Sequence, residues 1–189
     1  AAVRAPISRE GREFSVAAAV GIAFGRAGDD HPEKVLADAD IALHRAKLHG
    51  GNGYEIFDET MRRNLSERLG VELRMRRALD REEFAVHYQP EFGPEGTLMG
   101  FEALLRWNDA ELGAVPPTEF VPIAEESGLI LPLGRWALAE ACRQARAWND
   151  ARPASRPLMM SVNLSSLQLR DPLLLEYVAA ALERCGLAP

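Results

Sequence analysis

The sequence predicts an α/β fold built in two parts that are joined by a long helix. Short apolar runs bounded by glycine or proline alternate with segments of helical periodicity along the 189 residues. A composition with 47% hydrophobic and 26% charged residues is typical of a globular protein. The longest apolar run, 15–24, is about half of the roughly 20 residues that cross a bilayer. We therefore expect buried strands and no membrane contact from this segment.

The first part of the chain is predicted to contain a strand, a helix and a second strand. The apolar run 14–24 is bounded by glycine and indicates a buried strand. A helix is expected next, capped by Asp30 or His31 and ended by the glycines that follow residue 49. The apolar positions of this helix are Leu36, Ala39, Leu43 and Ala46. Residues 54–57 complete the pattern as a short strand.

Residues 59–80 are predicted to form the connecting helix. Three leucines four residues apart, Leu65, Leu69 and Leu73, mark its apolar stripe. Its arginines alternate with glutamates, which favours spaced ion pairs on a solvated helix over a polyanion-binding surface.

The rest of the chain alternates again between strands and helices, and this pattern is the beginning of an α/β barrel or of a doubly wound sheet. The last helix is expected to be capped by Asp171 and ended by Gly186. The predicted elements are strands 84–89 and 98–107, a helical region 118–148 with breaks at Gly128 and Pro132, strand 158–164 and helix 172–185.

Charge and cysteine content exclude some classes of protein. A formal net charge of −6 argues against DNA or RNA as partners, because phosphate-backbone binding needs a basic surplus. Cys142 and Cys185 have no metal-binding spacing, so we expect a reducing compartment, no structural zinc, and thiols that act as small apolar residues.

The segment GFEALLRW, residues 100–107, is the most informative for chemistry. Side chains alternate along a strand, so Glu102 and Arg106 share one face and the aromatic residues share the other. In a barrel, a carboxylate and a guanidinium on the inner face are suited to bind a metal ion and a phosphate. The alternative is a simple ion pair between Glu102 and Arg106.

Two more strands carry polar residues. Asn163 in MMSVNLSS is either a hydrogen-bonded residue of the inner face or an oxygen ligand of a hard cation. Gln89 in VHYQP lies just before a proline that is expected to end its strand, where a polar residue is usually no more than part of the rim.

These three segments, in this order and spacing, resemble the opening motifs of the EAL family, from about residue 75 to 189. The resemblance implies a (β/α) barrel of the TIM type that hydrolyses cyclic di-GMP to linear pGpG with Mg²⁺ or Mn²⁺. It implies that Glu102 and Asn163 bind the metal and that Gln89 and Arg106 contact the substrate. Further family motifs on later strands are not found in this chain, so we expect an incomplete barrel that is inactive alone.

Residues 13–58 resemble the C-terminal part of a GGDEF domain. The resemblance implies that Lys47 contacts nucleotide phosphates, although Gly51 stands where the family has an arginine; the alternative for Lys47 is a solvated residue in the last helical turn. The predicted domains are 1–58 (GGDEF part), 59–80 (connecting helix) and 81–189 (EAL part).

Alternatives for the whole protein are a degenerate cyclic di-GMP sensor, a bifunctional cyclase and phosphodiesterase, and a scaffold with no nucleotide role. The resemblance also predicts a cytoplasmic location and a homodimer through the EAL domain.

Overall fold

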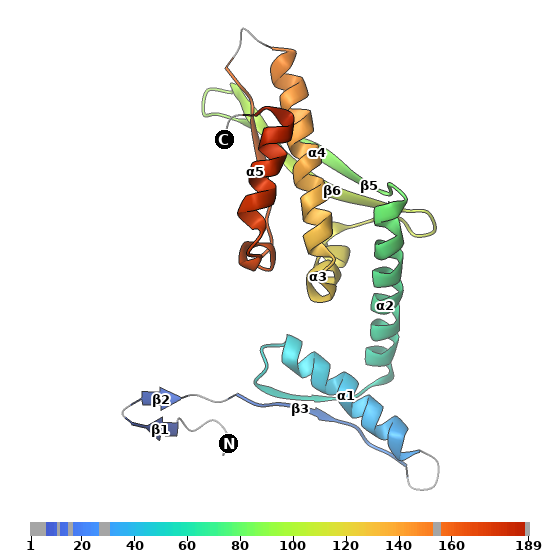
Figure 1. Cartoon of the computed structure of the whole chain (residues 1–189). Helices are drawn as coiled ribbons and strands as arrows, with labels where there is room; N and C mark the ends of the chain where they lie inside the picture. The colour runs from blue at the N-terminus through green and yellow to red at the C-terminus, as the bar shows by residue number, and fades with distance from the viewer. Residues whose placement is uncertain (1–6, 11, 15–16, 27–30, 153–155, 188–189) are drawn as a thin grey trace. The chain divides into compact units, whose positions relative to one another are not determined.

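A computed structural model describes residues 7–10, 12–14, 17–26, 31–152 and 156–187. The chain divides into two compact units, Ala1–Leu69 and Gly70–Pro189. The division falls inside helix α2 (Glu59–Asp80), which contributes residues to both units (Figure 1).

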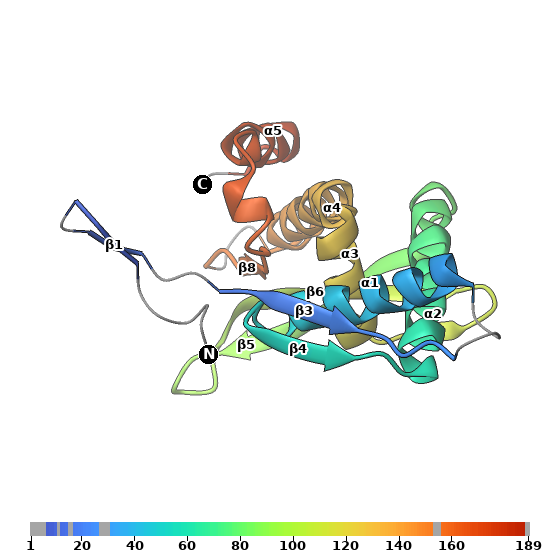
Figure 2. The same cartoon turned by 90° about the horizontal axis from the view of Figure 1, so that it is seen from below.

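The first unit is built around a parallel strand pair covered by one helix. Strands β3 (Ala19–Ile22) and β4 (Gly53–Ile56) are hydrogen-bonded, and α1 (Pro32–Leu48) connects them and packs on β3 (Figure 2). The approach is so close that a Cβ added at Gly21 would lie 2.0 Å from the carbonyl oxygen of Ala39. Strands β1 (Ile7–Arg9) and β2 (Arg12–Phe14) form a separate antiparallel pair.

Several expectations for this unit are wrong. The single strand expected over 14–24 is divided into β2 and β3, and Val20 in β3 is 47% exposed rather than buried. Leu36 is exposed, because α1 turns Asp38 and Ala42 inward, whereas Ala46 is buried as expected. His31 is the N-cap residue of α1 without a side-chain bond, and Asp30 lies outside the described residues.

Helix α2 has the predicted bounds, but its leucine stripe is not its buried face. Leu69 and Leu73 are more than half exposed, whereas Met61, Met75 and Ala78 are buried. Ion pairs within the helix are present as predicted: Arg62 binds Glu59, and Arg76 donates to Glu72 at 2.9 Å. Arg62 also binds Asp38 of α1, which was not predicted. Met61, Met75 and Ala78, rather than the leucines, are therefore the buried residues of this helix.

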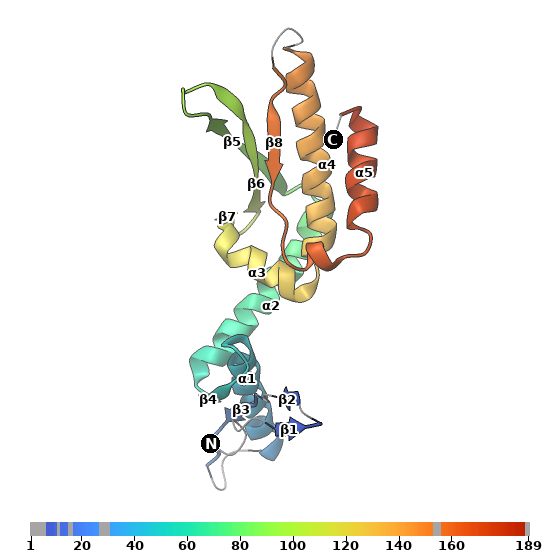
Figure 3. The ribbon, with the colours of Figure 1, turned by 90° about the vertical axis from the view of Figure 1, so that its left-hand side faces the viewer.

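The second unit is a sheet with helices on one face. Strand β6 is central: it pairs with β5 antiparallel, with β7 antiparallel near its end, and with β8 in parallel (Figure 3). Helices α3 and α4 lie between β6 and β8 in the chain and pack on the sheet, and α5 packs on α4. The elements are β5 (Phe84–Phe92), β6 (Leu98–Asp109), β7 (Gly113–Val115), α3 (Pro117–Ser127), α4 (Ile130–Asp150), β8 (Met159–Val162), the 3₁₀ turn η1 (Gln168–Arg170) and α5 (Leu174–Cys185).

An aromatic cluster holds the helices on this sheet. The rings of Phe84, Trp107 and Phe120 lie 5.7–6.0 Å apart, from β5, β6 and α3 respectively. Trp107 and Phe120 are almost completely buried, and each such side chain contributes roughly 1.5–3 kcal/mol through burial. Leu133 and Met75 extend the same core.

Several boundaries in this unit differ from the predictions; β6 continues to Asp109, and β8 ends at Val162 rather than at residue 164. Strand β5 continues through Pro90, which is tolerated because, in the described chain, β5 pairs on one side only. Gly128 ends α3 as expected, but Pro132 does not break α4, since it lies in the first turn, where backbone N–H groups have no intrahelical partner. Helix α5 starts at Leu174, two residues later than expected. The side chain of Asp171 still accepts a hydrogen bond from the backbone N–H of Leu173 at 2.9 Å, and it also binds Arg135 and Tyr177.

The cysteines behave largely as expected. Cys142 and Cys185 are free thiols, and burial raises the pKa of Cys142. A buried, protonated thiol acts as a small apolar residue.

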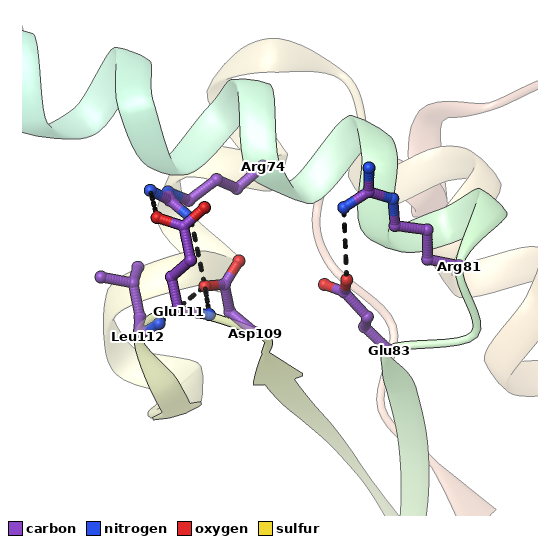
Figure 4. A network of polar contacts seen from close by, with 6 residues as sticks. All are labelled: Arg74, Arg81, Glu83, Asp109, Glu111 and Leu112. Atoms are coloured by element: carbon purple, nitrogen blue, oxygen red, sulfur yellow. Dashed lines mark hydrogen bonds and ion pairs between the residues drawn. The ribbon is translucent and has the colours of Figure 1, made fainter.

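A polar network fastens the C-terminal half of α2 to the turn after β6 (Figure 4). Asp109 is buried and accepts hydrogen bonds from the backbone N–H groups of Glu111 (2.8 Å) and Leu112 (2.7 Å). Arg74 donates to Glu111 at 2.6 Å and to Asp109 at 3.4 Å. Burial raises the pKa of Asp109, but the two N–H groups and the charge of Arg74 outweigh it and hold the pKa below its ordinary value.

We predict that Gly21→Ala destabilises the first unit by about 1–3 kcal/mol, because its methyl group would overlap backbone atoms of α1. Hydrogen exchange of the β3 and β4 amides measures this loss. Gly53→Ala is the matched control, since a Cβ there meets no atom within 4 Å. Equal protection in the two variants would contradict the packing of α1 on β3.

We predict that Asp109→Asn destabilises the second unit by about 1–3 kcal/mol at pH 7, because a buried charged acceptor is lost. A lowered folded-state pKa stabilises the fold above the unfolded pKa near 4, and this contribution disappears as the pH falls through the folded pKa. The difference between the two proteins should therefore shrink below about pH 4. Urea unfolding followed by tryptophan fluorescence reports on this unit, since all three tryptophans lie in it.

The control for this variant is Asp150→Asn, which removes an exposed i,i+4 pair with Arg146 that contributes little. A pH-independent difference for Asp109→Asn would show that its charge is not the stabilising feature.

Candidate functional site

The pairing of three strands places the predicted site residues on one face of the second unit. Gln89 of β5 lies opposite Glu102 of β6, and Glu102 lies beside Ser161 of β8. Paired residues point to the same face, and this is the face opposite to the buried aromatic residues Phe84 and Trp107. The predicted alternation of GFEALLRW is therefore confirmed.

The two predicted metal ligands are in contact. Asn163 follows the last residue of β8, and its Nδ2 donates a hydrogen bond to Oε1 of Glu102 at 2.6 Å. The residues are 61 positions apart in the sequence, so the parallel pairing of β6 and β8 is what joins them. They lie where β8 ends, which is the edge at which parallel α/β sheets carry their sites.

Arg106 lies on the same face as Glu102, four residues further along β6. Its Nη1 donates to the carbonyl oxygen of Leu105 at 2.8 Å, and the side chain is half-buried. Within the described residues it makes no ion pair with Glu102, so the ion-pair alternative is wrong. Most of the donors of its guanidinium thus remain available for an anion.

Arg106 and Asn163 line one cavity of about 370 Å³. Its walls are mostly apolar and come from α3, α4 and side chains such as Val86, Ala103 and Leu105, while Glu125 and Gln168 add polar groups. Most of this lining therefore belongs to the helix-covered side of the sheet rather than to the face of Glu102. Such a cavity, with a few convergent polar side chains, is typical of a small-molecule site.

Glu102 and Asn163 provide some of the oxygen ligands that a hard divalent cation needs, but not all of them. Carboxylate and carboxamide oxygens are the ligands that Mg²⁺ and Mn²⁺ prefer, and rotation of the Asn163 amide would present Oδ1 in place of Nδ2. Mg²⁺ takes six ligands in octahedral geometry, so two residues supply a minority of them. The described part of the chain holds no group of three or more His, Cys, Asp or Glu side chains suited to a metal ion.

The other two predicted site residues, Gln89 and Lys47, are exposed side chains. Gln89 is exposed and faces Glu102 across the β5–β6 pair. Lys47 is exposed in the last turn of α1, in the first unit, where it complements the helix dipole.

Sequence reasoning missed Glu91 as a member of this face. Its carboxylate accepts a hydrogen bond from Oγ of Ser161 at 2.9 Å. The alternation of β5 places Glu91 beside Gln89, but the expectation that Pro90 ends the strand hid this position. The alternation of side chains continues through Pro90, and this pattern could have indicated that Glu91 shares the face of Gln89.

Comparisons with known proteins agree with this architecture. The EAL domain model matches residues 72–189. The chain belongs to the EAL domain family.

The sequence is also similar to curated proteins of known name. The chain is 39% identical over 178 residues to the bifunctional diguanylate cyclase/cyclic di-GMP phosphodiesterase MucR of Pseudomonas aeruginosa, covering 94% of this chain and 26% of MucR. It is 35% identical over 159 residues to the cyclic di-GMP phosphodiesterase PdeR of Escherichia coli, covering 84% of this chain and 24% of PdeR. The chain thus spans about a quarter of the length of these curated relatives.

Solved structures show the same fold. The PaMucR phosphodiesterase in its c-di-GMP complex superposes with a TM-score of 0.60 and 42% identity, covering 64% of this chain and 48% of that chain. The FimX EAL domain of Pseudomonas aeruginosa bound to c-di-GMP gives 0.55 and 29%, covering 63% and 46%. The second unit is therefore an EAL-type α/β fold, consistent with part of a TIM-like barrel. Among the helices of the described segments, none is long and apolar enough to cross a membrane.

Proposed function

We propose that the protein carrying this chain is a metal-dependent cyclic di-GMP phosphodiesterase, and that this chain supplies part of its EAL domain. The observation that carries the proposal is the contact between Glu102 and Asn163, which brings together the two residues that match metal ligands of the EAL motifs. The names of MucR and PdeR and the c-di-GMP complex of PaMucR support the same substrate.

The residues have separate roles in the proposed reaction. Glu102 and Asn163 would hold Mg²⁺ or Mn²⁺ at the end of β8. A divalent cation held there would supply a lowered pKa for an attacking water and neutralisation of the phosphodiester charge. Arg106 would hold a phosphate oxygen through its free guanidinium donors, and Gln89 would contact the substrate from β5.

These residues bind and orient, but they do not form a complete catalytic set. The EAL resemblance places further metal-binding acidic residues and a water-positioning lysine on later strands, and the chain covers 48% of the PaMucR structure. We therefore expect hydrolysis only from a protein that contains the complete EAL domain.

The first unit is proposed to be the C-terminal part of a GGDEF domain, with α2 as the connecting helix. The match to MucR covers 94% of the chain and so extends beyond the EAL boundary at residue 72. Lys47 would then contact nucleotide phosphates. The cytoplasmic location and the homodimer stay predictions.

We predict that Glu102→Ala, in a protein with the complete EAL domain, lowers the rate of pGpG formation at least about 100-fold, because a metal ligand is lost. Turnover with Mn²⁺ or Mg²⁺ and binding of Mn²⁺ are both measured. Glu95→Ala, an exposed residue of the β5–β6 turn, is the control and should be fully active. Full activity of Glu102→Ala would contradict the proposal, whereas ligand binding without turnover in the unmutated protein would identify a sensor.

We predict that Arg106→Lys raises the KM for cyclic di-GMP about tenfold or more, because an ammonium group replaces a planar fork that binds phosphate through two donors. Steady-state kinetics of the same protein measure it. Arg76→Lys on α2 is the control, since Arg76 binds only Glu72 among the described residues. An unchanged KM would exclude Arg106 from the phosphate site.

A further inference from the structure

The contact between Glu91 and Ser161 joins two strands that are not neighbours in the sheet. Glu91 belongs to β5 and Ser161 to β8, and β6 lies between them. The carboxylate nevertheless accepts a hydrogen bond from the Ser161 hydroxyl at 2.9 Å, across 70 positions of sequence. A side chain must therefore pass over β6 on the face that carries Glu102.

The residue of β6 beneath this contact is a glycine. Gly100 lies opposite Glu91 and beside Met159, so no β6 side chain stands in this row of the face. A Cβ at Gly100 would also lie 2.4 Å from the carbonyl oxygen of Met159. The close approach of β6 and β8 and the open row both depend on glycine at this position.

Two carboxylates consequently bind successive face residues of β8. Glu91 binds Ser161 and Glu102 binds Asn163, one row further along. Diagonal positions in neighbouring strands are about 7–8 Å apart, so the charge of Glu91 lies close to that of Glu102. Among the described residues Glu91 is bonded to a neutral hydroxyl and has no ion pair, so its charge is not neutralised.

We infer that Glu91 is a positioning residue that strengthens divalent cation binding by Glu102 and Asn163. Its charge attracts the cation without binding it directly, and its bond to Ser161 holds the strand that carries Asn163. This inference rests on the proposed metal site. It concerns a residue to which the EAL resemblance assigned no role.

The test is Mn²⁺ binding to the protein with the complete EAL domain, followed by the electron paramagnetic resonance of free Mn²⁺. Glu91→Gln keeps an oxygen that accepts the Ser161 bond but removes the charge. It should weaken Mn²⁺ binding about tenfold at low ionic strength, and this loss should shrink towards twofold in 1 M KCl. Glu91→Asp, which keeps the charge, should recover most of the affinity.

Two controls separate the charge from the fold. Glu95→Gln removes an equal charge from the exposed turn of the same hairpin and should change Mn²⁺ affinity less than twofold. Hydrogen exchange of the Met160 and Ser161 amides should be the same in Glu91→Gln and in the unmutated protein, since β8 stays paired.

The outcomes distinguish this inference from the proposed function. If Mn²⁺ binds and needs Glu102, but Glu91→Gln binds as tightly as the unmutated protein, the inference is overturned and the metal site stands. A loss that is independent of salt and accompanied by rapid exchange in β8 also overturns it, because the effect is then structural. If the unmutated protein does not bind Mn²⁺, both proposals fail.

Discussion

The register of β6 against β5 and β8 determines which side chains meet on each face of the second unit. Because side chains alternate along a strand, a shift by one residue would turn Trp107 to the polar face and Glu102 into the aromatic cluster. The burial of Trp107 with Phe84 and Phe120 makes such a shift costly, by several times the roughly 1.5–3 kcal/mol of one buried side chain. Packing on the helix side therefore positions the chemistry on the opposite side.

The same constraint explains how much could be predicted from the sequence. Local periodicity was enough to place Glu102 and Arg106 on one face, since both lie on one strand. The contact of Glu102 with Asn163 depends on a parallel pairing across two helices, and no local pattern contains that register. The motif resemblance indicated a shared role for the two residues, and the structure adds the contact.

The other incorrect expectations share one physical cause: contacts between distant parts of the chain decide which residues are buried and where a strand ends. Helical spacing in α2 identified a leucine stripe, but Leu69 and Leu73 are exposed while Met75 packs in the core, because α2 meets different neighbours in its two halves. Pro90 was expected to end β5, but a strand that pairs on one side only tolerates proline. The turn network of Arg74 and Asp109 joins residues 35 positions apart and was equally invisible to local reasoning.

On the face of the sheet that carries Glu102, the acidic and the basic side chains occupy different positions along β6. Carboxylates lie in the rows where β6 pairs with β8, and the guanidinium of Arg106 lies four residues further along β6. Within the described chain the acids bind a hydroxyl and an amide rather than a basic group, and Arg106 binds a backbone carbonyl. Ion pairing between these groups would have satisfied both charges and left little affinity for a ligand. Kept apart, the acids can attract a cation and the guanidinium can attract an anion.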